Sequence, residues 1–249
     1  MNIIDIEKPV IFPEKSIISG VTKRNLRAFP NQGGLSLSPG KILSKEELAD
    51  HRKAFAEGLG IPTDILKFQN QVHGDMIRVI TPDSKTEASD GMITSFKNIV
   101  LCIIIADCAA VLMYDPKNSV IAGFHSGWRG TQLNIVGKGI NILKDNFKSD
   151  PADLLVYVSP CASGERYIVR EDVAQHFPRS VKRINNKEYL FDNRMEIQLQ
   201  LHEAGVPRSN IEVSDGCTIG GEIDYHSYRR DGERSGRMAA FIGMKGESF

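Results

Sequence analysis

Three apolar runs follow one another in the middle of the chain, at residues 99–106, 109–114 and 120–124. Each has the length of a strand, and turn-forming residues separate the runs or end them. Because the runs show no polar alternation, they predict strands that are buried on both faces. The polar residues that stand where the runs stop are Asp107, Cys108, His125 and Arg129. Side chains at the ends of buried strands are held rigidly and can face a cleft, so we expect the chemistry here.

Composition restricts the class of protein. The 249 residues are 41% hydrophobic and 25% charged, which is ordinary for a soluble globular chain with a sizeable core. Basic and acidic residues balance at 31 each, so a general electrostatic attraction to nucleic acid or to a membrane is not expected. The longest apolar run falls well short of the ~20 residues of a membrane span, and no secretory signal is visible. Four cysteines without paired spacing favour reduced thiols and a cytoplasmic protein.

Helical and strand-like patterns are interleaved along the rest of the chain. Ser44 followed by Glu47 is a capping-box pattern, and Asn193 with Glu196 gives a second cap pair. We expect helices at 44–58, 134–147, 171–176 and 193–204, and extended segments at 16–22, 65–71, 76–80, 154–158, 211–214 and 238–242. Three successive central strands break a strict βαβ rhythm, and no linker or repeat divides the chain. The sequence therefore predicts an α+β fold, a single domain over residues 1–249 with mixed β-sheets flanked by helices.

Two histidines and a cysteine could bind one metal ion. His73 lies beside a glycine, and with Cys108 and His125 it would supply two imidazoles and a thiolate. Such a set suits zinc and leaves a fourth position for water or substrate. The gaps between these residues are long, so Cys108 could instead be a nucleophile with His125 as its base, or a small buried apolar residue.

Acidic and basic side chains could support such a centre. Asp107 adjoins Cys108, and a carboxylate near a metal can orient a ligand histidine or move a proton. The same role is open to Asp90, but a turn is the commoner explanation of an Asp-Gly pair, and we favour it here. Four arginines between residues 228 and 237 could hold a phosphate, although a solvated surface loop is the commoner explanation of such a run. Arg129 is a separate phosphate candidate.

Several motifs in a fixed order carry a resemblance to a known family. They are Gln71-Val72-His73-Gly74, Ala106-Asp107-Cys108-Ala109-Ala110-Val111-Leu112, His125-Ser126-Gly127-Trp128-Arg129-Gly130-Thr131 and Ser227-Tyr228-Arg229-Arg230-Asp231-Gly232. The chain thus resembles the YfiH family, also called the DUF152 or laccase-domain family, which has purine nucleoside phosphorylase and peptidoglycan-editing members. The resemblance implies an α+β fold of mixed sheets, with a zinc ion at His73, Cys108 and His125 in a cleft.

The same resemblance implies a reaction. It is the cleavage of adenosine, inosine, guanosine and S-methyl-5'-thioadenosine by phosphate, which gives a purine base and ribose 1-phosphate, together with adenosine deamination. Zinc can supply a water that ionises near neutral pH for deamination, whereas phosphorolysis needs phosphate positioned against the ribose carbon. We therefore expect Cys108, His125 and Asp107 to be catalytic. Phosphate is expected at Arg129, Arg229 or Arg230.

The sequence is compatible with other reactions as well. Ser126, Ile168 and the Ala162-Ser163 pair depart from the residues usual in the family, and these departures bear on substrate preference. The editing branch implies an amidase that removes L-Ser from UDP-MurNAc-L-Ser with the same Cys/His site. A polyphenol oxidase with Cu²⁺ in place of Zn²⁺ is less favoured, because multicopper sites need about ten histidines and the chain has six. The expected partners are purine nucleosides and phosphate, with no nucleic acid and no membrane, and the expected assembly is a monomer or homodimer.

Overall fold

Two β-sheets packed face to face form the core. The computed structural model describes residues 4–30, 33–39, 42–220 and 224–246. One sheet has the strand order β1 (Ile6–Glu7), β2 (Ile17–Thr22), β14 (Met238–Met244), β6 (Val100–Ile105) and β3 (Leu66–Lys67). The other has the order β13 (Ile211–Val213), β9 (Leu155–Val158), β7 (Ala109–Asp115), β8 (Val120–Ser126), β5 (Gly91–Thr94) and β4 (Ile77–Val79). Parallel pairing joins β3 to β6, β4 to β5 and β13 to β9, whereas the other neighbours are antiparallel, so both sheets are mixed as expected.

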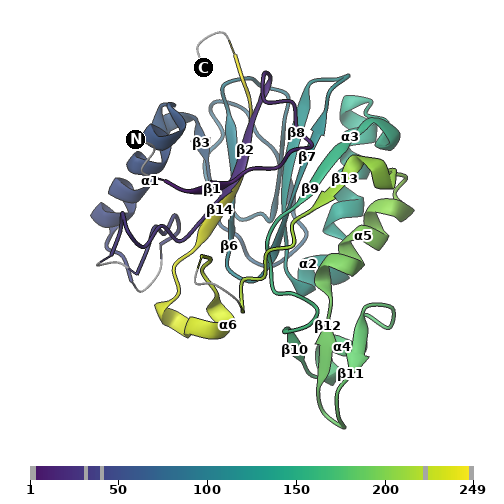
Figure 1. Cartoon of the computed structure of the whole chain (residues 1–249). Helices are drawn as coiled ribbons and strands as arrows, with labels where there is room; N and C mark the ends of the chain where they lie inside the picture. Colours follow the sequence, from purple (N-terminus) through teal and green to yellow (C-terminus); the bar gives the residue numbers. More distant parts are fainter. Residues whose placement is uncertain (1–3, 31–32, 40–41, 221–223, 247–249) are drawn as a thin grey trace.

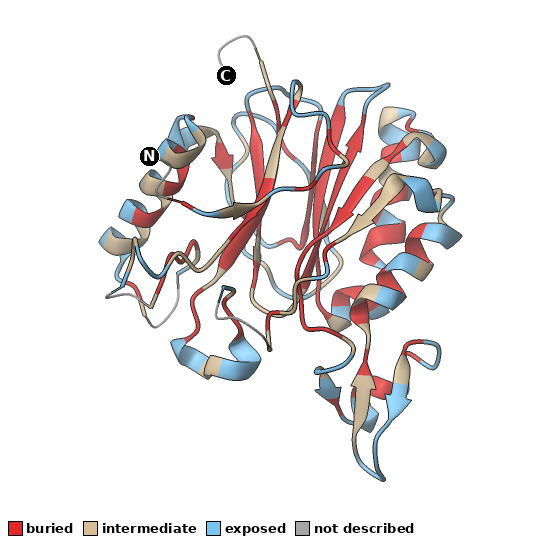
Figure 2. Ribbon diagram, in the orientation of Figure 1, coloured by how far each residue is buried: buried red, intermediate tan, exposed pale blue. Residues whose placement is uncertain are grey.

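The apolar central runs are strands covered on both faces, as their sequence predicts. In β6, Leu101 and Ile103 belong to the cluster between the two sheets, whereas Cys102 faces the opposite way into a second cluster. In β7, Leu112 points between the sheets and Val111 points outward into a third cluster. Figure 2 shows the resulting buried stretches along both sheets. Side chains of this kind each contribute roughly 1.5–3 kcal/mol on burial, so the central strands anchor the fold.

Helices cover the outer face of each sheet (Figure 1). Helix α1 (Lys45–Leu59) packs Phe55 against Phe241 of the five-stranded sheet. Helices α3 (Ile135–Phe147) and α5 (Asn193–Glu203) share the cluster on the outer face of the six-stranded sheet. The shorter helical segments are η1 (Thr63–Ile65), α2 (Trp128–Gln132), η2 (Pro151–Asp153), α4 (Glu171–Ala174), η3 (Arg208–Asn210), α6 (Tyr228–Asp231) and η4 (Gly232–Arg234). Within the described residues, no helix combines the length and the apolar character needed to cross a membrane.

A small third sheet projects from one end of the molecule and has no counterpart among the sequence predictions. Its order is β10 (Ile168–Val169), β12 (Tyr189–Phe191) and β11 (Val181–Arg183), with α4 packed beside it. Its apolar cluster is centred on Phe177 and Phe191, whose rings stack at 4.4 Å. The strands are only two or three residues long, which is too short for a periodic signal.

The helix boundaries test the local sequence rules. At α1 both bonds of the capping box between Ser44 and Glu47 are present, as predicted. At α5 the predicted cap is wrong, because the N-cap is Asp192 and its side chain accepts a bond from the Met195 N–H. Asn193 instead turns inward, where long-range hydrogen bonds outweigh the capping preference. The extended segment expected at 65–71 is a strand only at Leu66–Lys67.

Candidate metal centre and its pocket

His73, Cys108 and His125 come together at one end of the sheets. Their ligand atoms all lie within 4.8 Å of one another, and the two imidazole rings meet edge to face with centroids 4.8 Å apart. His125 stands at the end of β8, Cys108 lies in the turn between β6 and β7, and His73 belongs to the loop before β4. His125 is buried, Cys108 is half-buried and His73 is exposed, so the group is open on one side. Three residues that are far apart in the sequence therefore form one compact group of possible metal ligands.

The β7–β8 hairpin and the turn before it set this geometry. Ala110 pairs with His125 in the antiparallel register, which brings the end of β8 beside the start of β7. Asp107 takes a left-handed φ of 83° in the turn before β7, a conformation that aspartate tolerates better than most residues. A Cβ on Gly127 would lie 2.7 Å from Sγ of Cys108, so only glycine leaves room for the thiol there.

The Asp90 carboxylate ties two of the histidines together. It accepts a 2.8 Å bond from Nδ1 of His125 and a 3.0 Å bond from the backbone N–H of His73. Its second oxygen accepts bonds from the N–H groups of Val72 and Gly74. Because Nδ1 of His125 donates to a carboxylate, its Nε2 is left as the donor atom for a metal. The sequence interpretation of Asp90 as a turn residue is wrong, since this fully buried side chain organises the site.

Electrostatics favour a thiolate at Cys108. Burial alone would raise the pKa of the thiol, but the charge and hydrogen bond of His125, with smaller effects from His73, lower it to about 6. Burial likewise opposes the charged form of His125, yet Cys108 and Asp90 raise its pKa to about 9. By contrast, burial raises the pKa of Cys161 to about 12. Cys108 is therefore suited to act as a metal ligand or as a nucleophile.

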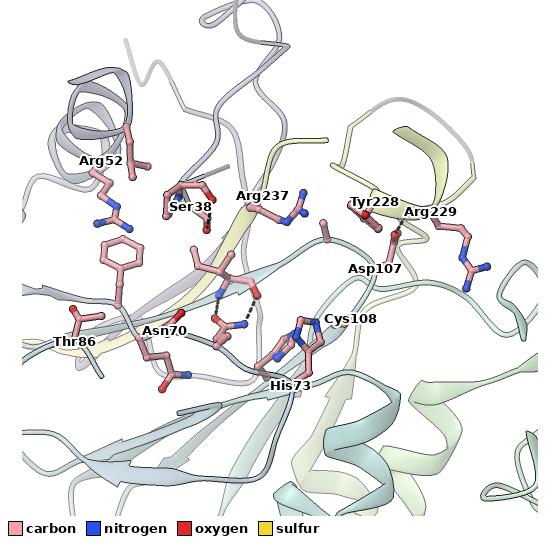
Figure 3. A pocket seen from close by; sticks show the side chains of 18 of the residues that line it. Ser38, Arg52, Asn70, His73, Thr86, Asp107, Cys108, Tyr228, Arg229 and Arg237 are labelled. Atoms are coloured by element: carbon pink, nitrogen blue, oxygen red, sulfur yellow. Dashed lines mark hydrogen bonds between the residues drawn. The ribbon is translucent and has the colours of Figure 1, made fainter. Parts of the chain in front are cut away.

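The group lies on the wall of a cavity of about 800 Å³ (Figure 3). Asp107 also lines this cavity, and its carboxylate accepts bonds from the Thr218 hydroxyl at 2.7 Å and from the Arg229 N–H at 2.6 Å. Other cavity residues are Arg52, Phe68, Tyr167, Tyr228, Arg229 and Arg237. Aromatic faces and cationic groups thus surround the Cys/His cluster.

The three arginines expected to bind phosphate occupy different surroundings. Arg229 lines the cavity at its exposed rim, with its guanidinium 5.1 Å from the Tyr167 ring centroid. Arg230 hydrogen-bonds to the carbonyls of Thr218 and Tyr225 and forms an ion pair with Asp231. Its side chain therefore makes its contacts within the protein. Arg129 is exposed outside the set of cavity residues and stacks over Trp128 at 4.3 Å.

Sequence reasoning did not single out Arg52 or Phe68, and it included Arg237 only as one of the four arginines between residues 228 and 237. Arg52 lies on α1 with its guanidinium 3.8 Å from the Phe68 ring centroid, and nothing in its helical surroundings distinguishes it from a surface arginine. Arg237 belongs to the arginine-rich run between residues 228 and 237 and immediately precedes β14. Its position next to an apolar strand is the sequence signal that sets it apart from the other arginines of the run.

Comparison with known proteins identifies the family. The family model described as multi-copper polyphenol oxidoreductase laccase matches residues 31–245. The chain belongs to this family. It is 27% identical to the purine nucleoside phosphorylase YlmD of Bacillus subtilis, over 93% of this chain and 90% of that protein. It is 31% identical to a purine nucleoside phosphorylase of Deinococcus radiodurans, over 85% of this chain and 86% of that protein. The crystal structure of YfiH from Bacillus licheniformis superimposes with a TM-score of 0.86 at 27% identity, covering 92% and 93% of the two chains.

The family description names more than one copper ion, so the number of possible metal sites in this chain is of interest. Among the described residues, His73, Cys108 and His125 form one group of three side chains able to hold an ion. The family and this group together indicate a metal site, whose donors are two nitrogens and one sulfur. A site of three protein donors leaves a position for a reacting molecule.

Proposed function

We propose that this protein is a zinc-dependent purine nucleoside phosphorylase that acts on adenosine, inosine, guanosine and S-methyl-5'-thioadenosine, and that it also deaminates adenosine. The observation that carries the proposal is the meeting of His73, Cys108 and His125 on the wall of a cavity with aromatic and arginine side chains. The relatives named as purine nucleoside phosphorylases support the same reaction class.

The residues fit a zinc ion. Two imidazole nitrogens and a thiolate of lowered pKa are preferred zinc donors, and the Asp90–His125 bond is the kind of support that metal-binding histidines use. Bound there, zinc would supply Lewis-acid stabilisation of developing negative charge and a water of lowered pKa. The same donors could also accept Cu²⁺, so metal analysis is part of the test.

The cavity residues have separable tasks in phosphorolysis. The exposed ring of Tyr228 offers a face on which a purine can stack. Arg229 offers positive charge for phosphate at the rim, and the ribose carbon has to lie between phosphate and the departing base. We assign Asp107 to proton transfer at the departing purine, because its carboxyl lines the cavity and two hydrogen bonds hold its orientation. The carboxylate would take up a proton from water and pass it to the base nitrogen as the bond to the ribose carbon breaks.

Product analysis tests this assignment. Metal-quantified protein and its Cys108→Ala variant are incubated with adenosine, with and without phosphate, and the products are separated by chromatography. The proposal expects adenine and ribose 1-phosphate only with phosphate and only with the intact site. Inosine formed without phosphate is the expected sign of deamination. Absence of both adenine and hypoxanthine when phosphate is present, with zinc bound, contradicts the phosphorylase assignment.

An amidase is the second candidate, and the Cys108–His125 pair favours it. A thiol with a pKa of about 6 beside an imidazole is also a nucleophile–base arrangement. Such an enzyme would release L-Ser from UDP-MurNAc-L-Ser, and loss of the gene would make that precursor accumulate. A copper polyphenol oxidase is the weakest candidate, because the whole chain has six histidines. Blue or type 3 copper absorption bands in the purified protein would favour it.

A further inference from the structure

Arg237 is held rigidly on the wall of the cavity that contains the Cys/His cluster (Figure 3). Its backbone N–H donates to the Ser36 hydroxyl at 3.0 Å, and its carbonyl accepts a 3.0 Å bond from the Leu37 N–H. The next residue begins β14, which lies between β2 and β6 in the five-stranded sheet. The position of Arg237 is therefore fixed by the sheet and by a segment more than 190 residues away in sequence.

One edge of the Arg237 guanidinium is occupied and the other is open. Nη1 donates to the carbonyls of Ser235 at 2.7 Å and Gly236 at 2.9 Å, which sets the plane of the group. The Nε and Nη2 donors have no hydrogen-bond partner, and the side chain has no ion-pair partner, among the described residues. Nε–H and Nη2–H point in parallel and form the edge that binds two oxygens of one carboxylate or phosphate. The protein thus leaves the bidentate edge free.

Two of the nearby arginines, Arg52 and Arg230, use the same edge within the protein. In Arg52, Nε and Nη2 both donate to the Leu37 carbonyl. In Arg230, Nε and Nη2 both bind the Asp231 carboxylate. Arg237 therefore differs from both in keeping these donors available, although it faces the same cavity as Arg52.

The surroundings of Arg237 also favour an anion. The side chain is half-buried, and burial lowers its pKa from the ordinary value although nearby acidic groups oppose the shift. A guanidinium stays protonated in spite of such a shift, so a partly desolvated positive charge without a counter-ion remains. The nearby Asp107 carboxylate contributes to that opposing effect, but it is hydrogen-bonded to Thr218 and to the Arg229 N–H and forms no ion pair with Arg237 among the described residues.

We propose that Arg237 is an anion-binding residue inside the cavity and holds a phosphate group through its Nε and Nη2 donors, with Arg229 adding positive charge at the rim. The assignment deepens the proposed phosphorolysis and rests on it for the identity of the anion as free phosphate. It places phosphate inside the cavity, at an arginine of the 228–237 run other than Arg229 and Arg230. The same chemistry would also suit a phosphoryl group carried by a larger ligand, such as a nucleoside diphosphate.

The test compares full-length, metal-loaded Arg237→Met and Arg237→Lys proteins with the wild type. Phosphate binding is measured by ³¹P NMR titration with inorganic phosphate, independently of turnover, and KM values are measured for phosphate and for inosine. Arg208→Met is the matched control, because Arg208 is exposed in η3 outside the cavity residues. Thermal melting checks that each variant is folded.

We expect Arg237→Met to raise the phosphate dissociation constant and the phosphate KM by at least about tenfold, with the inosine KM within about twofold. Arg237→Lys should be intermediate, because an ammonium keeps the charge but lacks the paired donors. If Arg237→Met does not fold, the phosphate dissociation constant and the phosphate KM of Arg237→Lys test the proposal instead. Unchanged phosphate binding and KM in a folded variant overturn the proposal.

A second arm separates free phosphate from a bound phosphoryl group. UDP is titrated into the same proteins, alone and in competition with phosphate. UDP binding that depends on Arg237, with no phosphate binding by the wild type, overturns the free-phosphate assignment. Phosphate binding that depends on Arg237 without any phosphorolysis supports the anion site and contradicts the proposed function alone.

Discussion

Asp90 and His125 form a buried carboxylate–imidazole pair, with Oδ1 of Asp90 2.8 Å from Nδ1 of His125. The same oxygen accepts the backbone N–H of His73, so one side chain orients two of the three candidate ligands. Asp90 immediately precedes β5, the strand that pairs with β8, and the His125 N–H donates to the Asp90 carbonyl at 2.7 Å. Backbone and side chain therefore hold the pair in the same place.

Removing the charge of Asp90 should weaken metal binding. In Asp90→Asn the side-chain amide has one oxygen and cannot accept hydrogen bonds from all the N–H groups that donate to the carboxylate. We therefore expect the zinc affinity to fall by about 10–100-fold. The free energy of unfolding should fall by about 1–3 kcal/mol, because buried donors lose their acceptor. Competition with a chromophoric chelator measures the affinity, and Asp83→Asn, at an exposed loop position, is the control. Wild-type zinc affinity in Asp90→Asn would contradict this role.

In the metal-free protein, the thiol of Cys108 should ionise at a lower pH than the thiol of an ordinary cysteine. Its pKa is lowered to about 6 from 9.0, so its thiolate fraction rises with pH through 6 and is nearly complete at neutral pH. We expect alkylation by iodoacetamide to follow this rise, and added zinc to protect the thiol. Peptide mapping by mass spectrometry separates Cys108 from Cys217, whose pKa is also lowered by hydrogen bonds that outweigh its burial. Alkylation of Cys108 that half-saturates near pH 9 would contradict the electrostatic argument.

Gly127 should tolerate no side chain. An alanine Cβ there would lie 2.7 Å from Sγ of Cys108, so either the thiol or the start of α2 has to move. We expect Gly127→Ala to lose about 1–3 kcal/mol of stability and much of its zinc affinity. Gly58→Ala is the control, since its Cβ would meet only the Ile4 side chain at 3.3 Å and alanine favours the helix. Denaturant unfolding and metal analysis distinguish the two variants, and a Gly127→Ala protein with wild-type zinc content would refute the argument.

His226 should make the protein less stable at acidic pH. It is buried with Nε2 2.8 Å from the Leu35 carbonyl, and burial, with Arg24 and Arg237, lowers its pKa to about 4 from 6.5. Between pH 6.5 and about 4, His226 is protonated in the unfolded chain but stays neutral in the folded protein. The free energy of unfolding therefore falls as the pH is lowered through this range, and it levels off below pH 4. The shift corresponds to roughly 3 kcal/mol.

The His226→Gln variant isolates this contribution. Glutamine can keep a donor for the Leu35 carbonyl but does not titrate. Chemical denaturation at several pH values should show a shallower loss of stability for the variant between pH 6.5 and 4. Parallel pH profiles for the two proteins would show that His226 does not titrate as argued.

Local patterns predicted the elements that depend on neighbours in sequence. The uninterrupted apolar character of residues 99–106 and 109–114 indicated strands buried on both faces, because each face requires apolar side chains. The capping box at Ser44 was visible because its partners are three residues apart. The cap at Asn193 was mispredicted because distant Ser126 and Thr131 compete for its side chain.

The sequence by itself determined the buried central strands, the main helices and the resemblance that named His73, Cys108 and His125. Only the tertiary structure decided that Asp90 organises these residues and that Arg237, unlike Arg52 and Arg230, keeps its bidentate edge free in the cavity. The physical reason is that strand and cap preferences act over a few residues. The orientation of a buried carboxylate or guanidinium instead depends on partners that strand pairing brings from distant parts of the chain.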